Sequence, residues 1–237
     1  MVEPEICFYK LNNIIKLSIY LIKYLIKYVI NNCIEDLNYI DLYLSKNNKE
    51  IHNNLYSNNL ILSLKKIYKL KFIKISYNKI IKILRKNKIH FNKLDSNIKW
   101  GLDLNSSHEK FLVNKYFKKP IVIYNYPSNI KPFYMKENKN NNGKYKTVRS
   151  MDLLLPNIGE LIGGSEREED ENKLIKKMEY LNINKDILWW YIQSRKYGSV
   201  PHSGFGMGFD RLVQFITSIN NIRDVILCPR TPKNILF

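Results

Sequence analysis

Cysteine is scarce in this chain of 237 residues, and the three that occur are far apart. Cys7, Cys33 and Cys228 are odd in number and include no C-x-x-C pair. A disulfide framework uses an even set of cysteines, and a structural zinc site uses closely spaced pairs. The sequence therefore predicts neither, and it fits a reducing intracellular compartment.

A long uninterrupted apolar run is also missing, although 45% of the residues are hydrophobic. Three lysines interrupt the most apolar stretch, residues 14–30, and a charge near the middle of a membrane-spanning helix is costly. Residues 1–20 carry Glu3 and Glu5 where a signal peptide would be basic. We therefore expect a soluble protein with no membrane partner.

Acidic residues number only 21, against 39 Lys and Arg, so the net charge is +18. Such a surplus fits either a Lys-rich solvated surface or an anionic partner such as nucleic acid. Charge by itself favours the first interpretation.

Glycine is absent from residues 1–100, which also hold a single arginine. All nine glycines and six of the seven arginines follow. Glycine permits close backbone approach and arginine offers a planar, bidentate donor. We therefore expect the chemistry after residue 100 and a mainly helical segment before it.

Hydrophobic periodicity predicts the secondary structure. In the first part it indicates helices at 17–29, 36–44, 60–70 and 77–84, a loop at 46–59 and a short strand at 71–75. In the second part it indicates strands at 121–124, 145–155 and 160–163, a loop tip at 137–144 and a last helix at 209–219.

A turn at Pro156–Gly159 predicts a hairpin with two acidic residues. Asp152 and Glu160 are equidistant from Pro156, so a simple antiparallel register would place them opposite each other, about 5 Å apart at Cβ. Two carboxylates so close call for a cation, such as the Mg²⁺ of a bound nucleotide. The alternative is a solvent-exposed pair in a looser register.

The segment Ser165–Glu168 has the S-x-x-E pattern of a capping box, which predicts the start of a helix. Arg167 would then lie at a helix N-terminus, where a cation is unfavourable unless it binds an anion or a polar ligand. The alternative is an ion pair with Glu168 or Asp170.

Alternating glycines follow at 204, 206 and 208, and a helix then opens with Asp210 and Arg211. Glycines on one strand face leave a floor on which a planar ring can lie, and Arg211 could contact a phosphate. The pattern is neither the dinucleotide-binding fingerprint nor a P-loop. His202 by itself is more often structural than catalytic.

These segments carry a family resemblance. Residues 204–212 resemble motif 3 of class II aminoacyl-tRNA synthetases, and residues 151–169 (MDLLLPNIGELIGGSEREE) resemble the aspartyl/asparaginyl branch. Within the latter, Gly-Gly-Ser-x-Arg-Glu-Glu is similar to the asparaginyl enzymes, of the bacterial or organellar type. Residues 1–5 resemble the last strand of motif 2, and matching motifs occur in order along the chain.

The resemblance implies an α+β fold in which helices flank an antiparallel sheet. Residues 1–237 would form the C-terminal part of the catalytic domain, with helices in 1–100 and the active-site strands and motif 3 in 101–237. The family's anticodon-binding OB domain and motif 1 would precede Met1. We therefore expect the chain to be inactive on its own.

The resemblance also implies the activity. The family activates L-asparagine with ATP and Mg²⁺ to an adenylate and transfers it to tRNA(Asn), as a homodimer in the full-length protein. The compartment would be the cytoplasm of a bacterium, or a plastid or mitochondrion. The open alternatives are an aspartate–tRNA ligase or an amide synthetase derived from it, and a non-catalytic paralog.

The resemblance further assigns roles to single residues. Asp152 and Glu160 match the positions that hold Mg²⁺ and ATP, and Arg167 matches the arginine that reads the substrate side chain. The remaining matches are Arg211 on the γ-phosphate and adenine, Gly206 and Gly208 near the nucleotide, Glu3 on the α-ammonium, and His202, Ser203 and Gly204 as pocket lining.

Overall fold

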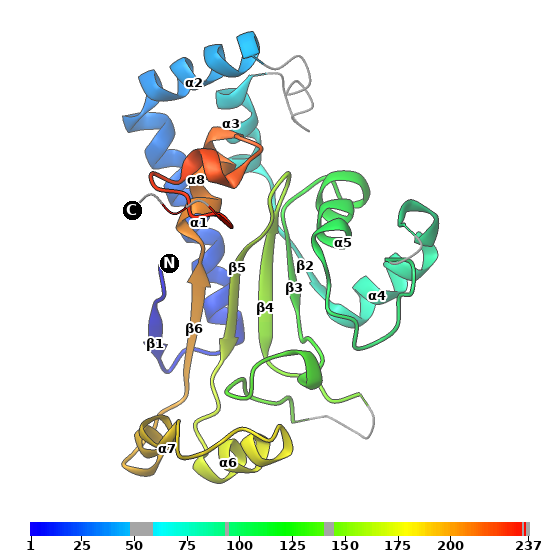
Figure 1. The fold of residues 1–237 in the computed structure, drawn as a ribbon, viewed down its shortest axis with the longest axis vertical. Helices are drawn as coiled ribbons and strands as arrows, with labels where there is room; N and C mark the ends of the chain where they lie inside the picture. Colours follow the sequence, from blue (N-terminus) through cyan, green and yellow to red (C-terminus); the bar gives the residue numbers. More distant parts are fainter. Residues whose placement is uncertain (48–58, 93–94, 140–144, 234, 236–237) are drawn as a thin grey trace.

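The computed structural model describes residues 1–47, 59–92, 95–139, 145–233 and 235. Within them, six strands form one sheet with helices against it (Figure 1). Its spatial order is β1-β6-β5-β4-β3-β2. The strands are β1 (Glu5–Cys7), β2 (Ile73–Ser76), β3 (Ile121–Tyr124), β4 (Ser150–Leu155), β5 (Gly159–Glu166) and β6 (His202–Met207).

All neighbouring strands pair antiparallel except β2 and β3, which pair in parallel. Parallel neighbours need a long crossover connection. Here the connection between β2 and β3 contains helices, among them α4 (Tyr77–Lys86) and α5 (Ser106–Lys110). The architecture is therefore the expected sheet flanked by helices, with one parallel pair at its edge.

The helices are α1 (Leu11–Asn32), α2 (Ile34–Asn47), α3 (Leu60–Lys69), α4 (Tyr77–Lys86), α5 (Ser106–Lys110), α6 (Glu171–Tyr180), α7 (Trp189–Lys196) and α8 (Phe209–Thr217). The predicted helices at 17–29, 36–44, 60–70, 77–84 and 209–219 occur close to those positions, whereas α5 and α7 were not predicted. Short turns of helix are η2 (Lys88–His90), η3 (Phe111–Tyr116), η4 (Ser128–Ile130) and η5 (Ile222–Val225). The predicted loops at 46–59 and 137–144 lie mostly outside the described residues.

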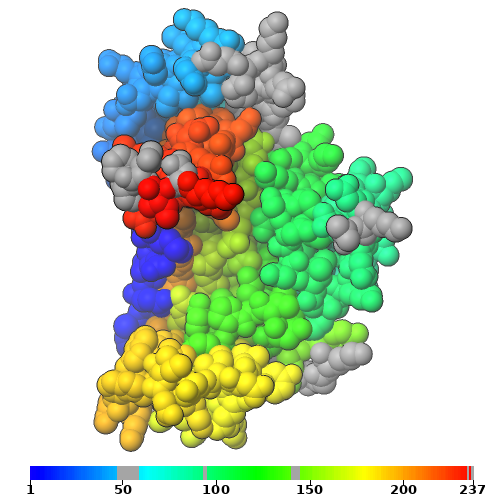
Figure 2. All heavy atoms as spheres, in the orientation of Figure 1, coloured from blue at the N-terminus to red at the C-terminus, as the bar shows by residue number. Residues whose placement is uncertain are grey.

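Two hydrophobic cores lie on opposite faces of the sheet. On one face, α1, α3 and α8 pack against side chains such as Leu153 and Phe205. On the other, α4 and η3 pack against Ile121, Ile123 and Leu154. In Figure 2 the blue residues lie at the left and top of the molecule and the teal residues at the right, with green residues between them. No helix in the described part of the chain has the length and apolar character needed to cross a membrane.

The second core covers only part of its face. Its sheet residues come from β2, β3 and β4, and in Figure 1 α4 and α5 lie beside β2 and β3, away from β1 and β6. The helices of this core therefore do not cover the same face of β5, β6 and β1. It carries the residues of the candidate site.

The register of the β4–β5 hairpin differs from the prediction. Asp152 pairs with Gly163, and Glu160 pairs with Leu154, so the two acids are not directly opposite. The register shifts between Leu153 and Leu154, where Leu161 is an extra residue on β5. Such a bulge places two residues of one strand against one of its partner. The symmetric register around Pro156 was therefore wrong.

The predicted helix start at Ser165 was also wrong. β5 continues through Glu166, which still pairs with Ser203, and α6 begins only at Glu171. Asp170 is its N-cap and accepts from the Lys173 amide at 3.1 Å. Cross-strand pairing satisfies the backbone up to Glu166, so a local capping pattern does not decide its conformation.

Glu166 instead caps a different helix. Its side chain is 3% exposed, and its Oε2 accepts from the amide of Leu11, the first residue of α1, at 3.3 Å. Its Oε1 pairs with Arg149. Because α1 has no acidic residue in its own first turn, this carboxylate supplies the negative charge that a helix N-terminus favours.

The α1 side of the sheet yields a stability prediction. Ile22 is 0% exposed in the first core, whereas Ile89 is 90% exposed. Ile22→Ala leaves a cavity and should lower the free energy of unfolding by about 3 kcal/mol. The matched change Ile89→Ala should alter it by less than about 0.5 kcal/mol. Urea unfolding followed by circular dichroism measures both, and equal losses would contradict the assigned packing.

Candidate active site

The uncovered part of the sheet carries glycines on one face. Gly163 on β5 pairs with Gly206 on β6, and Gly204 pairs with Ser165. The residues between them, such as Phe205, belong to the core beneath α1, so the glycines face the opposite way. We call Gly163, Gly204 and Gly206 the glycine floor. Gly208 lies beyond it, as the N-cap of α8.

Two carboxylates converge over Gly163 at one side of the floor. A Cβ built on Gly163 would stand 2.8 Å from Glu160 Oε1 and 3.6 Å from Asp152 Oδ1. The bulge at Leu161 turns Glu160 to the same face as Gly163, three residues later, because it adds one residue to the alternation. The acids are therefore close together, although diagonally rather than directly opposed.

A third carboxylate supports this acidic end. Glu109, in α5, accepts the backbone amide of Glu160 at 3.0 Å through Oε2. Burial raises the pKa of Glu109 to about 7, and the charges of Glu160 and Asp152 add to the effect. Burial, followed by the charge of Asp152, also raises the pKa of Glu160. Raised carboxyl pKa values mark a place where an added cation is stabilising.

Lys131 is the cation nearest to Asp152. Its Nζ donates to Asp152 Oδ2 at 2.8 Å and lies 4.2 Å from the centre of the Tyr126 ring. Burial by itself lowers the pKa of Lys131, but the adjacent Asp152 carboxylate raises it above its ordinary value. Lys131 therefore stays charged and holds one oxygen of Asp152 in place.

The donor set at this end suits Mg²⁺ with a nucleotide. Nowhere in the described ranges do three His, Cys, Asp or Glu side chains gather as a metal site. Mg²⁺ needs only one or two carboxylates when phosphates supply further oxygens. Asp152 and Glu160, with the pKa of Glu160 already raised by burial and then by the charge of Asp152, meet that requirement.

Arg167 lies at another side of the floor and pairs with Glu5. Its Nη2 is 2.5 Å and its Nε 3.0 Å from Glu5 Oε1, while its Nη1 donates to Ser165 Oγ at 2.5 Å. The guanidinium also lies 5.0 Å from the centre of the Tyr134 ring. Its side chain is 13% exposed, so it is fixed in orientation yet reachable. It forms neither of the local ion pairs that the sequence left open, with Glu168 or Asp170.

Glu3 and Arg211 border the floor near Gly206 and Gly208. Glu3 Oε1 is 3.8 Å from the point where a Cβ on Gly206 would stand. Arg211 donates to the Glu160 backbone carbonyl at 2.7 Å, and its aliphatic carbons lie 3.6 Å from a Cβ position on Gly208. Arg211 thus lies beside the acidic end, as an exposed side chain on the first turn of α8.

Of the two remaining predicted pocket residues, His202 lies on the face of the floor and Ser203 on the opposite face. His202 lies one residue pair beyond Gly204 on the same face, with its ring nitrogens near the Val200 carbonyl and the Arg195 guanidinium. Ser203 faces the opposite side, is fully buried and donates to the Tyr9 carbonyl at 2.6 Å. Ser203 therefore does not line the floor, because adjacent strand residues point to opposite faces.

Sequence reasoning did not assign site roles to Glu5, Glu109 or Lys131. Glu5 had a usable signal, since it is two residues from Glu3 and residues so spaced share a strand face. Glu109 and Lys131 lie in segments that match the family, but no pattern in the hairpin or the glycine strand points to them, because each reaches the site from a separate segment. Only the tertiary fold brings them to Glu160 and Asp152.

Comparison with known proteins identifies the family of the chain. The sequence model of the tRNA synthetases class II (D, K and N) matches residues 1–232. An asparagine–tRNA ligase of Azobacteroides pseudotrichonymphae is 46% identical over 237 residues, which is 100% of this chain and 47% of that protein. The chain spans about half the length of the curated relatives it matches.

Solved structures give the same result. Asparaginyl-tRNA synthetase from Pyrococcus horikoshii, complexed with asparaginyl-adenylate, superposes with a TM-score of 0.79 at 32% identity, over 98% of this chain and 47% of that one. An aspartyl-tRNA synthetase from Entamoeba histolytica shares the fold, with a TM-score of 0.73 at 20% identity over 98% of this chain and 43% of that one. The chain belongs to the class II tRNA synthetases of the D, K and N family.

Proposed function

We propose that the chain supplies the C-terminal part of the catalytic domain of an asparagine–tRNA ligase. That enzyme would activate L-asparagine with ATP and transfer it to tRNA(Asn). The observation that carries the proposal is the glycine floor, with the carboxylates of Asp152 and Glu160 at one side and the Arg167–Glu5 pair at another. Similarity to asparagine–tRNA ligases supports the choice of amino acid.

The Arg167–Glu5 pair suits a carboxamide. Arg167 offers N–H donors and Glu5 offers carboxylate acceptors side by side. A carboxamide has one oxygen that accepts and one NH₂ that donates, so it matches both partners. A carboxylate substrate would place its charge against Glu5. In this proposal Arg167 reads the side-chain oxygen, and Glu3 binds the α-ammonium group across Gly206.

The other side of the floor suits the nucleotide. Arg211 would contact the phosphates and lie over the adenine, and Gly206 and Gly208 would leave room for the ring. Asp152 and Glu160 would hold the Mg²⁺ that accompanies ATP. When bound, that ion would neutralise phosphate charge. Lys131 would keep Asp152 oriented, and Glu109 would fix the backbone at Glu160.

Catalysis in this proposal is mainly positioning. The asparagine carboxylate attacks the α-phosphorus of ATP, and pyrophosphate leaves. Arg167 and Glu3 fix the asparagine at two points, so its carboxylate has a defined direction, and such orientation lowers the entropic part of the barrier. Arg211 supplies positive charge to the phosphates as they rearrange. A hydroxyl of the terminal adenosine of the tRNA then attacks the acyl carbon of the adenylate, so the ester forms and AMP leaves.

The proposal extends to assembly and location. The complete enzyme would act as a homodimer. It would work where tRNA is charged, in the cytoplasm of a bacterium or in a plastid or mitochondrion.

ATP–pyrophosphate exchange tests the proposal directly. The protein is expressed from the whole gene, with any coding sequence upstream of residue 1, and assayed with asparagine and with aspartate. Exchange that depends on asparagine is expected. Exchange that depends on aspartate would move the assignment to the aspartate enzyme, and a folded protein with neither activity would favour a non-catalytic paralog.

The carboxylates give the first activity prediction. Asp152→Asn and Glu160→Gln keep the size of each side chain but remove its charge. Each should lower exchange by about 100-fold or more and raise the Mg²⁺ concentration needed for half-maximal rate. The matched control Asp186→Asn changes an exposed acid far along the chain and should leave exchange unchanged. Variants with wild-type Mg²⁺ dependence would rule out the assigned role.

Arg167 gives the second activity prediction. Arg167→Lys keeps the positive charge but loses the fork that contacts Glu5 and Ser165. We expect kcat/KM for asparagine to fall about 100-fold while the KM for ATP stays within about twofold. Arg223→Lys, in η5, is the matched control. An equal rise in the KM for asparagine and in the KM for ATP would show that Arg167 supports the fold rather than reading the amino acid.

A further inference from the structure

Helix α7 lies next to α6, at the end of the sheet where β5 ends and β6 begins (Figure 1). It belongs to neither hydrophobic core, and none of its side chains is fully buried. Two of them, Tyr191 and Arg195, are nevertheless half-buried, and both contact the segments around Arg167. Packing into a core therefore does not explain where these two side chains lie.

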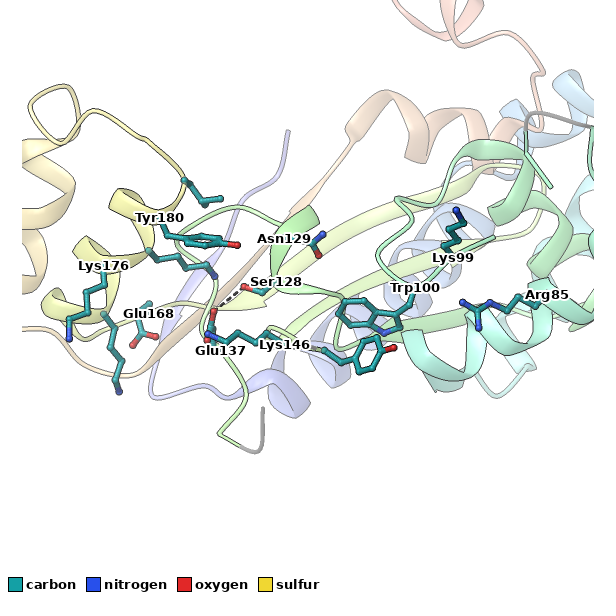
Figure 3. A pocket seen from close by; sticks show the side chains of 14 residues that line it. Arg85, Lys99, Trp100, Ser128, Asn129, Glu137, Lys146, Glu168, Lys176 and Tyr180 are labelled. Carbon is teal, nitrogen blue, oxygen red and sulfur yellow. Dashed lines mark hydrogen bonds between the residues drawn. The ribbon is translucent and has the colours of Figure 1, made fainter. Parts of the chain in front are cut away.

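Arg195 is a half-buried cation without a carboxylate partner in the described part of the chain. Its Nε donates to the backbone carbonyl of Glu168 at 3.2 Å, and its Nη2 donates to Tyr191 Oη at 2.7 Å. The Glu168 side chain lines a cavity beside α6 (Figure 3), so the backbone of Glu168, not its carboxylate, meets Arg195. Arg195 therefore ties α7 to the residue that follows Arg167.

Tyr191 is held between Arg195 and two other rings. The Arg195 guanidinium lies 3.9 Å from the centre of the Tyr191 ring. Burial raises the pKa of Tyr191, so its hydroxyl stays protonated and neutral. The same ring contacts Phe133 and Tyr134, with 5.9 and 6.5 Å between ring centres. Arg195 thus fixes Tyr191 against this aromatic pair.

Tyr134 contacts both Tyr191 and Arg167. The Arg167 guanidinium lies 5.0 Å from the centre of the Tyr134 ring, and the Tyr134 carbonyl accepts from the Glu168 amide at 2.8 Å. A cation–π contact requires the cation within about 6 Å of the ring centre. Arg167 is therefore stacked on a ring whose own position depends on Tyr191.

The orientation of Arg167 bears on which amino acid the site prefers. A free arginine fork pairs best with a carboxylate, through two parallel charge-assisted hydrogen bonds. Here Nε and Nη2 of Arg167 are occupied by Glu5, so that edge of the fork is not available to a second carboxylate. Any change that lets Arg167 turn away from Glu5 would therefore favour aspartate over asparagine.

We propose that Tyr191 and Arg195 are positioning residues that hold Arg167 against Glu5, and that α7 thereby sets the preference for a carboxamide over a carboxylate. Neither residue touches the amino acid in this proposal, because each acts through Tyr134 and Arg167. The inference rests on the proposed function, since it concerns the choice of amino acid at the same site.

Amino-acid discrimination tests this inference. Pyrophosphate exchange is measured on the whole protein with asparagine and with aspartate, each over a range of concentrations. Tyr191→Ala should lower kcat/KM for asparagine about 30-fold, lower the asparagine-to-aspartate ratio of kcat/KM at least about tenfold, and leave the KM for ATP within about twofold. The control Tyr180→Ala removes a ring that is 80% exposed and should change none of these values. A Tyr191→Ala variant that loses both activities equally would overturn the inference.

The hydroxyl and the guanidinium are tested separately. Tyr191→Phe keeps the ring but loses the acceptor for Arg195, so kcat/KM for asparagine should fall only about threefold. Arg195→Gln should lower the asparagine-to-aspartate ratio about tenfold, whereas Lys196→Gln, at an exposed neighbour on α7, should leave it unchanged. Equal effects of these two variants would contradict the role of Arg195. Thermal melting establishes that each variant is folded, and Tyr191→Leu replaces a Tyr191→Ala variant that is not.

A double-mutant cycle shows whether Tyr191 acts through Arg167. In the Arg167→Lys background, Tyr191→Ala should lower kcat/KM for asparagine less than about threefold further, because the fork that Tyr191 positions is already gone. A further loss of about 30-fold would show that the two residues act independently, and the positioning role would be refuted.

Chemical modification of Arg167 separates this inference from the function on which it rests. Phenylglyoxal reacts with accessible guanidinium groups, and mass spectrometry of the peptide that contains Arg167 gives the rate without any activity measurement. The Arg167 side chain is 13% exposed, so Tyr191→Ala should speed its modification at least about fivefold, and Tyr180→Ala should not change it. Faster modification in a protein whose wild type shows no asparagine-dependent exchange would refute the ligase activity and keep the positioning role. Unchanged modification in a protein that shows exchange would refute the positioning role and keep the ligase activity.

Discussion

The extra residue at Leu161 determines which side chains reach the glycine floor. Without this bulge, Glu160 and Gly163, three residues apart, would face opposite sides of β5. With it, Glu160 lies on the face of Gly163 and Asp152, and its carboxylate comes close to that of Asp152. The acidic end of the site, and the cation it calls for, both follow from one local irregularity in the hairpin.

The incomplete cover on one face of the sheet is the second constraint. Helices α4 and η3 pack on β3 and the adjoining part of β4, so large apolar side chains occupy that area. Beyond it the strands carry glycine, serine and charged residues. Gly204 illustrates the reason, since a Cβ there would stand 2.2 Å from the Glu5 carboxylate. Removing side chains from the floor leaves space for a ligand and for the groups that bind it.

One strand also separates neighbouring charges by function. Along β5 and its extension, Arg167 faces the floor and pairs with Glu5, Glu166 faces the other way and caps α1, and Glu168 lines a cavity beside α6. Three consecutive charged side chains thus lie in three different environments. Alternation along the strand turns Arg167 to the opposite side from Glu166, whereas Glu168 lies beyond the end of β5.

The sequence by itself determined most of the helices and strands and the residue types of the site, because hydrophobic periodicity and the positions of glycine and arginine are local properties. It also placed the carboxylates in one hairpin and the alternating glycines on one strand. Tertiary structure decided the rest. The bulge set the register, continued pairing with β6 kept residues 165–166 extended, and Lys131 and Glu109 reached the site from distant segments. No local pattern encodes these features, since each depends on which strand or loop lies beside another.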